Sequence, residues 1–267
     1  MKNVLYTLVS LVALLSSCAN SYNIQGTSNV STLDGHKLYL TVVNEDAVKH
    51  IDSCDVVHGQ FAFSGALDST RMAGIFMDRV SILPVVLESG DIVIKLDNTQ
   101  QTIGGTPLND KLYKFLQSFG QLQNESSELV HKQSQAIMDG LDMDVVNRQL
   151  AVQDAQITQK MDKLLTSFVT ENFDNVLGPG IFMMVTSDYE IPVFTPWIED
   201  ILSKASDRFK NDPYVKQYVE AAKHNQDLMN GMAEQPGMPA PPAPGTIEGA
   251  AVAPPTPAEL ASDTLRK

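Results

Sequence analysis

Short apolar runs separated by turn residues occupy the chain up to about Gly105. The clearest runs are residues 37–43, 60–65, 73–78, 82–87 and 91–96. In several of them a hydrophobic side chain recurs at every second position, which is typical of strands with one face buried in a core. About six to eight strands, spaced by roughly ten residues, predict an antiparallel β-sandwich or open barrel.

Two features of these runs predict local geometry. Residues 56–65 place His58 and Gly59 between two apolar stretches, a pattern that predicts a hairpin with one buried face. Pro84 interrupts the run 82–87 and lacks the N–H that a central strand donates. We therefore expect this strand at a sheet edge or at a bulge.

The apolar period lengthens to that of helices after Gly105. Thr106 and Pro107 are typical of an N-cap and a first helical position, and Pro196 and Pro213 also open predicted helices. The predicted helices cover residues 108–120, 125–138, 143–172, 177–186, 197–205 and 214–224. A strand-rich part followed by a helical part predicts an α+β fold.

Two segments of the helical part need separate interpretation. The long segment 143–172 has an apolar stripe with polar residues elsewhere, so it either packs against neighbouring helices or forms a coiled-coil arm for a partner. Gly178, Pro179 and Gly180 lack the glycine and lysine that complete a phosphate-binding loop. We interpret them as a helix break.

The first seventeen residues predict a secretory signal peptide. A basic residue precedes the apolar run from Val4 to Leu15, which as a helix is about 18 Å long and too short for a hydrocarbon core of about 30 Å. Ser16 and Ser17 then precede Cys18, in the order of the bacterial lipobox. In lipoproteins with this motif the chain is cut before the cysteine, which carries acyl chains. We predict lipidation at Cys18; the alternative is an ordinary signal peptide with an incidental cysteine.

Composition and charge exclude several classes of ligand. The chain has 267 residues, of which 43% are hydrophobic, and its 19 Lys and Arg against 32 Asp and Glu give a net charge of −13. Nucleic acids and anionic lipid surfaces are bound through basic patches. We therefore expect no nucleic acid partner, and we expect acyl chains rather than electrostatics to hold the protein to a membrane.

The remaining candidate groups have structural interpretations. If Cys18 is lipidated, Cys54 carries the one remaining thiol. We expect Cys54 to be a small core residue, because the nearby carboxylates of Asp52 and Asp55 disfavour its thiolate. The alternative is an exposed reactive thiol. The five histidines show no metal-ligand spacing. Trp197 is expected to pack on a helix, with a ligand platform as the alternative. We therefore predict no catalytic residue, no cofactor and no metal site.

Five short segments, three of which contain glycine, carry a resemblance to a known family. They are residues 51–53, 59–65, 87–94, 105–109 and 212–215. The chain resembles, over about residues 22–226, the domain-of-unknown-function family 4369 of Bacteroidetes lipoproteins, a module that commonly precedes a thioredoxin-like domain. The family's redox chemistry needs a CxxC pair, which the sequence lacks. We therefore do not expect the oxidoreductase activity itself.

These interpretations divide the chain into a signal peptide (1–17), a β-sandwich (18–106), a helical subdomain (107–228) and a disordered Pro-rich tail (229–267). We expect a non-enzymatic lipoprotein of the cell envelope that binds or assembles with an envelope protein. Acylated Cys18 would anchor it to the outer membrane, facing the periplasm. The alternative is an accessory role in envelope thiol–disulfide exchange, in which the chain docks onto a separate thioredoxin-like protein.

Overall fold

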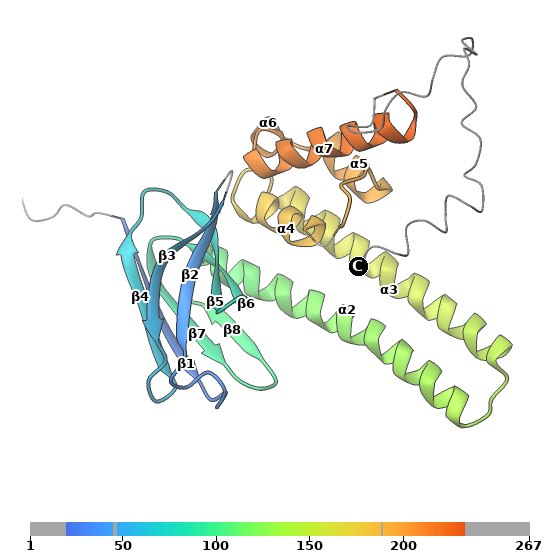
Figure 1. Ribbon diagram of the computed structural model, residues 1–267, viewed down its shortest axis with the longest axis horizontal. Helices are drawn as coiled ribbons and strands as arrows, with labels where there is room; N and C mark the ends of the chain where they lie inside the picture. The colour runs from blue at the N-terminus through green and yellow to red at the C-terminus, as the bar shows by residue number, and fades with distance from the viewer. Residues whose placement is uncertain (1–19, 45–46, 188, 233–267) are drawn as a thin grey trace, which may run out of the picture.

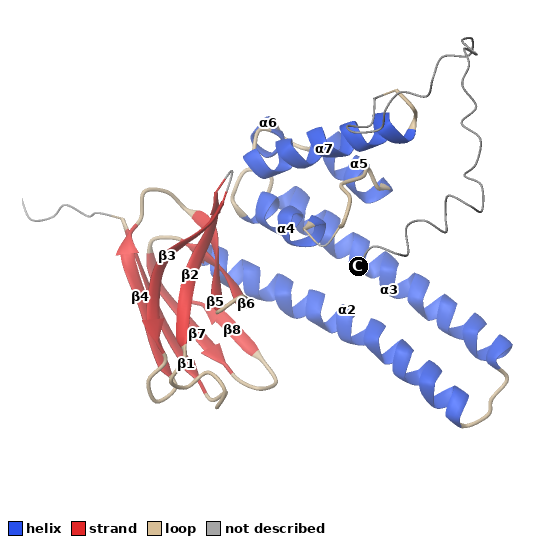
Figure 2. Ribbon diagram, viewed as in Figure 1, coloured by secondary structure: helices blue, strands red, loops and turns tan. Residues whose placement is uncertain are grey.

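The computed structural model describes residues 20–44, 47–187 and 189–232. A β-sandwich at one end of the molecule is followed by helices, which is the predicted α+β fold (Figure 1). The strands are β1 (Ser21–Ser28), β2 (Lys37–Asn44), β3 (Ala47–Asp55), β4 (Gln60–Ala66), β5 (Arg71–Met77), β6 (Val80–Leu87), β7 (Gly90–Leu96) and β8 (Gln101–Gly104). The helices are α2 (Pro107–Met138), α3 (Met143–Glu171), α4 (Leu177–Thr186), α5 (Pro196–Lys204), α6 (Asp207–Lys210) and α7 (Pro213–Met229). The strands thus all precede the helices along the described chain (Figure 2).

Two four-stranded sheets make up the sandwich. Their strand orders are β4-β1-β7-β8 and β3-β2-β5-β6. Neighbouring strands are antiparallel except β1 and β7, which run parallel from the pair Tyr22–Gly90 to the pair Ser28–Leu96. The predicted sandwich is therefore present, with one parallel pair that the strand pattern did not reveal.

The alternating residues of both sheets face one another and form the first core. Fully buried members from the two sheets are Ile24, Leu38, Leu40, Ile75, Ile92 and Ile94. Burying a side chain of this kind contributes about 1.5–3 kcal/mol relative to leaving it in water. The strand alternation noted in the sequence is the cause of this layer, because successive side chains of a strand point to opposite faces.

The predicted hairpin over residues 56–65 is wrong beyond its turn. His58 and Gly59 both have positive φ, 51° and 70°, and Val57 and Gln60 exchange two backbone hydrogen bonds of 2.9 and 3.0 Å. After this single bridge, β4 leaves β3 and pairs with β1 in the other sheet. Alternation identifies the buried face of a strand but not the strand beside it, so the sequence did not distinguish the two pairings.

Pro84 lies in β6, an edge strand, which confirms the prediction for this proline. Further along β6 the Asn109 side chain takes the place of a neighbouring strand. Its Oδ1 accepts from the Val86 N–H at 2.9 Å, and its Nδ2 donates to the Val86 carbonyl at 2.8 Å. Helix α2 therefore covers part of an edge that would otherwise expose unpaired backbone groups.

The first two predicted helices are one helix, α2. Gly120 lies inside it with ordinary helical surroundings, and residues 121–124 continue the helix rather than ending it. A glycine in a helix interior costs only about 1 kcal/mol relative to alanine. Packing of α2 along α3 offsets a cost of this size, so the glycine does not break the helix.

Gly178, Pro179 and Gly180 lie in the first turn of α4, so the predicted helix break is wrong. Proline is tolerated there because the first N–H groups of a helix have no partner within it. A Cβ at Gly180 would lie 2.5 Å from Cγ of Met72 in β5. The glycine thus lets α4 approach the outer face of the sandwich closely.

A second core joins the helices to that face of the sandwich. Phe182 of α4 stacks on Trp197 at 5.9 Å between ring centroids and meets Phe209 and Tyr218 edge-on at 5.6 and 5.3 Å. Trp197 is therefore a packing residue, as predicted. Val86 of β6 belongs to the same cluster, so the sandwich and the base of the helical part share a packed boundary.

Candidate interaction surface

The predicted lipidation site lies outside the described residues. So do the signal peptide, residues 1–17, and most of the predicted tail. Cys54 lies in β3, half-buried against the first core. Burial raises the pKa of its thiol, the carboxylates of Asp52 and Asp55 raise it further, and the Ala62 backbone N–H and the Lys37 ammonium oppose them. A thiol held protonated in this way is a poor nucleophile.

The family-like segments 87–94 and 105–109 meet at a buried polar junction rather than at a reactive site. The Glu88 carboxylate, in the turn between β6 and β7, accepts from the backbone N–H groups of Leu108 and Asn109 at 2.8 and 3.0 Å and so caps α2. Nδ2 of Asn109 also donates to Oγ1 of Thr106 at 2.9 Å. Thr106 is therefore the N-cap residue by position, but the carboxylate of Glu88 supplies the cap.

Two glycines allow the junction to close. Gly105 has a φ of 96°, and a Cβ there would collide with the Asp91 carbonyl. Gly90 has a φ of 130° and faces Thr106. Both positions need a conformation that L side chains rarely adopt. The two glycines therefore fix the angle between the sandwich and α2, and they carry no chemistry of their own.

The distal parts of α2 and α3 form a helical hairpin that extends away from the two cores (Figure 1). We call residues 120–160 the arm. The 32 residues of α2 make a helix of about 48 Å, so the end of the arm lies far from the sandwich. The base of α3 packs in the second core through Leu165, Phe168 and Val169. Segment 143–172 thus packs against neighbouring helices in both halves, on α2 in the arm and in the second core at its base, and its use as an arm for a partner stays a prediction.

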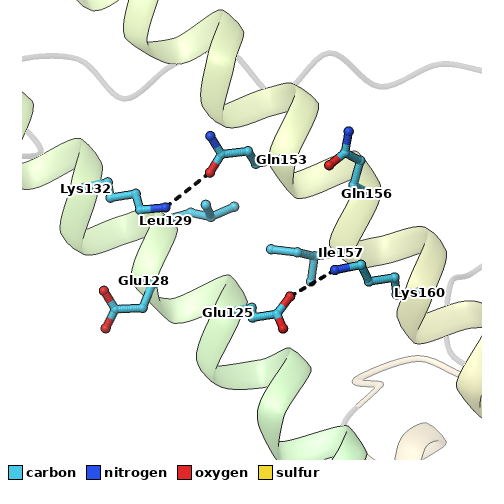
Figure 3. Close-up of a pocket in the computed structure, with 8 residues that line it drawn as sticks. All are labelled: Glu125, Glu128, Leu129, Lys132, Gln153, Gln156, Ile157 and Lys160. Carbon is cyan, nitrogen blue, oxygen red and sulfur yellow. Dashed lines mark hydrogen bonds and ion pairs between the residues drawn. The ribbon is translucent and has the colours of Figure 1, made fainter.

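The seam between the two arm helices alternates apolar and polar layers. The apolar layers repeat at seven-residue spacing and consist of Leu122, Leu129, Ala136, Met143, Leu150 and Ile157. Polar pairs lie between them: Lys132 donates to Gln153 Oε1 at 3.3 Å, and Lys160 lies 3.2 Å from Glu125 Oε2 (Figure 3). A coiled coil fills such layers with apolar side chains, but two of them are polar here. The hairpin is therefore held by few buried apolar contacts.

A shallow groove of about 330 Å³ follows this seam. Leu129 and Ile157 lie toward the line between the helices, and two carboxylates, two ammonium groups and two carboxamides surround them (Figure 3). The remaining polar lining residues are Glu125, Glu128, Lys132, Gln153, Gln156 and Lys160. The groove offers hydrogen-bonding groups of both charges along two helices, which suits a protein surface better than a small enclosed ligand.

The end of the arm exposes large apolar side chains. Ile137, Met138, Leu141 and Val145 are 62, 85, 54 and 40% exposed. The turn between the two helices does not depend on the side chains of Ile137, Met138 or Val145. Gly140 has a φ of 66°, and the Leu141 N–H donates to the Ala136 carbonyl at 3.0 Å, which is a Schellman-type ending.

Two kinds of feature are absent from the part of the chain that the structure describes. No three or more histidine, cysteine, aspartate or glutamate side chains gather there as metal ligands. Nor is any helix of these residues both long enough and apolar enough to span a bilayer. The sequence analysis missed the exposed end of the arm, although Met138, Leu141 and Val145 stand beside a Gly140 turn signal in the sequence.

Comparison with known proteins identifies the first part of the chain. Residues 22–112 match the family described as "Domain of unknown function (DUF4369)". No curated protein and no solved structure matches the chain. The match covers the strands from β1 to β8 and the first turn of α2, and it therefore includes the whole polar junction. Most of the arm and the second core lie beyond it. Residues 22–112 form a domain of the DUF4369 family.

Proposed function

We propose that the protein is a lipid-anchored lipoprotein of the cell envelope that binds a protein partner through its arm and catalyses no reaction itself. The observation that carries this proposal is the arm: a long hairpin with a partly polar seam and exposed apolar residues along and at its end. Val130 and Val152 on its sides are 64 and 59% exposed. Exposed apolar residues gathered on a projecting element are typical of interaction surfaces.

The position of Asn20 supports the proposed anchor at Cys18. Asn20 lies beside the end of β4, since the Leu67 N–H donates to its carbonyl at 2.8 Å. This corner of the sandwich and the end of the arm lie at opposite ends of the molecule (Figure 1). Acyl chains two residues before Asn20 would hold the sandwich close to the membrane and direct the arm away from it. We further propose that the membrane is the outer one and that the arm faces the periplasm.

The anchor is tested by Cys18→Ala, with Cys54→Ala as the matched control. We expect Cys18→Ala to move the protein to the soluble fraction and to abolish fatty-acid labelling, because more than one acyl chain is needed for stable anchoring and none would remain. Cys54→Ala should leave both unchanged. Continued membrane attachment of an unlabelled Cys18→Ala protein contradicts the anchor.

The binding role is tested separately, in membranes that carry the lipidated protein. A photoreactive residue is placed at Val130 or Val152 on the arm, and at Val93 on the sandwich as a control that is also exposed. We expect both arm positions to cross-link a protein and Val93 to cross-link none. Absence of cross-links from the arm refutes the binding role. Capture of a thioredoxin-like protein would instead identify the binding role as accessory work in thiol–disulfide exchange.

A further inference from the structure

The end of the arm combines apolar side chains with carboxylates and carries no cation. We call residues 137–145 the arm tip. Its apolar members are Ile137, Met138, Leu141 and Val145, and its charged members are Asp139, Asp142 and Asp144. All three aspartates are exposed. None of the three takes part in an ion pair with another described residue.

The fold does not require most of these side chains. Gly140 makes the turn, and Asp142 caps α3 by accepting from the Asp144 N–H at 3.0 Å. Leu141 follows the glycine in the position whose apolar contact completes a Schellman ending. Ile137, Met138 and Val145 have no such role. Met138, at 85%, is the most exposed large hydrophobic side chain of the described chain, and no packing partner accounts for it.

The charge of the tip distinguishes between the kinds of surface to which it can bind. A second arm tip would bring six carboxylates together, and an anionic lipid surface would repel the three that are present. No Lys, Arg or His occurs between Lys132 and Arg148 to offset either repulsion. A surface with an apolar centre and a cationic rim complements both the apolar side chains and the carboxylates of the tip. It buries Met138 at the centre of the contact and pairs the carboxylates with cations at its edge.

We propose that the arm tip inserts Met138 into an apolar pocket of an envelope protein whose rim carries Lys and Arg side chains. Methionine suits such an anchor, since its unbranched and polarisable side chain adapts to an irregular pocket. The tip is small, so this contact belongs to the class of weak or transient interfaces unless the sides of the arm also engage. The inference rests on the proposed binding role of the arm and specifies its partner.

The test uses the lipidated full-length protein in native membranes, with a photoreactive residue at Leu141. Two variants address the two components: Met138→Gln removes the apolar anchor, and the triple change of Asp139, Asp142 and Asp144 to Asn removes the charge. Asparagine still caps a helix, so the triple variant keeps the hairpin ending. Val93→Gln, at an exposed position of the sandwich, is the matched control for Met138→Gln.

We expect cross-linking at Leu141 to one protein, reduced about tenfold by Met138→Gln and unchanged by Val93→Gln, as for a central anchor residue. The triple variant should lower the cross-linking yield and remove its dependence on salt. Reversing the tip charge to Lys should restore the contact only when the partner's rim cations are changed to Glu. A rim without cations, or a triple variant with an unchanged yield, overturns the proposal.

Three further outcomes also overturn it: a cross-link to a second copy, a cross-link to lipid, or no cross-link at Leu141. The lipid alternative is checked directly with Cys18→Ala protein and vesicles of phosphatidylglycerol and phosphatidylethanolamine, which we expect not to bind. Cross-linking from Val130 and Val152 tests the binding role of the arm separately from the role of the arm tip. If it persists while the tip gives none, the proposed function stands and this inference fails; if it too is absent, both fail.

Discussion

In the β-sandwich, the inward side chains of both sheets are apolar and almost wholly removed from water, whereas in the arm two polar pairs lie between the apolar layers. Ile24 and Ile92 of one sheet and Leu40 of the other are 0% exposed. Leu129 and Ile157, among the best buried residues of the arm, are each 8% exposed, and Glu125 pairs with Lys160 beside them.

This difference separates a rigid part from one that opens locally. Regions with few buried apolar contacts and solvent-exposed hydrogen bonds open at a smaller free energy than the global unfolding of the protein. Interaction elements are commonly drawn from such regions, since they must adapt to a partner. The polar junction at Glu88 and Asn109 holds the base of the arm to the sandwich, so adaptation is confined to its distal part.

The largest expected effect comes from the sandwich core. Phe63→Ala removes a side chain that is 1% exposed, and we expect it to lower the free energy of unfolding by about 3–5 kcal/mol, because the surrounding strands leave a cavity. Leu129→Ala in the arm should cost only about 1 kcal/mol, since the hairpin closes around the change. Urea unfolding measures both. Equal costs would refute the contrast between the two regions.

The junction should show the next largest effect. Asn109→Ala removes the side-chain bonds to Val86 and Thr106 and leaves buried polar groups without partners, so we expect a loss of about 2–4 kcal/mol. Asn23→Ala is a matched control, because the Asn23 amide donates to Asp91 in an exposed bond of 2.9 Å. It should cost less than about 0.5 kcal/mol in the same urea titration. A comparable loss in the control would contradict the proposed role of the junction.

Replacing a polar layer of the arm with apolar side chains should reduce the difference in stability between the arm and the sandwich. The double change of Lys132 and Gln153 to Leu inserts an apolar layer beside Leu129, and we expect it to stabilise the arm by about 1–2 kcal/mol. Hydrogen exchange of the arm amides should slow, while exchange in the sandwich stays the same. Lys163→Leu, at an exposed position of α3, serves as the control and should leave exchange unchanged. Unaltered arm exchange in the double variant would show that the polar layers do not limit its stability.

The smallest effect concerns Cys54, on the sandwich. Since burial raises the pKa of this thiol, the folded protein keeps its proton to higher pH than the unfolded chain does. Its contribution to stability is therefore present below the ordinary thiol pKa and lost as the pH rises through the raised one. In Cys18→Ala protein, alkylation by iodoacetamide should lag behind that of the urea-unfolded chain between about pH 8 and 9. Equal rates would show that the thiol is not protected.

Local elements were largely predictable because their causes lie within a few residues. The strand alternation of residues 92–96 and the prolines that open α5 and α7 act through short-range geometry. The edge position of Pro84 follows from its missing N–H. That α2 continues through Gly120 as one helix was not predictable, because the stability of α2 at this point depends on packing against α3, which begins more than twenty residues further along the chain. The charge of the arm tip was visible in the sequence, but its exposure was not.

The sequence by itself determined the α+β order, the buried face of strands such as β4 and β7, the starts of α2, α5 and α7, and the acidic, cation-free character of residues 137–145. These properties depend on the chemistry and spacing of near neighbours. Only the tertiary structure decided that β4 pairs with β1, that Glu88 caps α2, and that the distal halves of two long helices stand alone as an arm. Each of these depends on contacts between segments distant in the chain, and many alternative pairings satisfy the same local pattern.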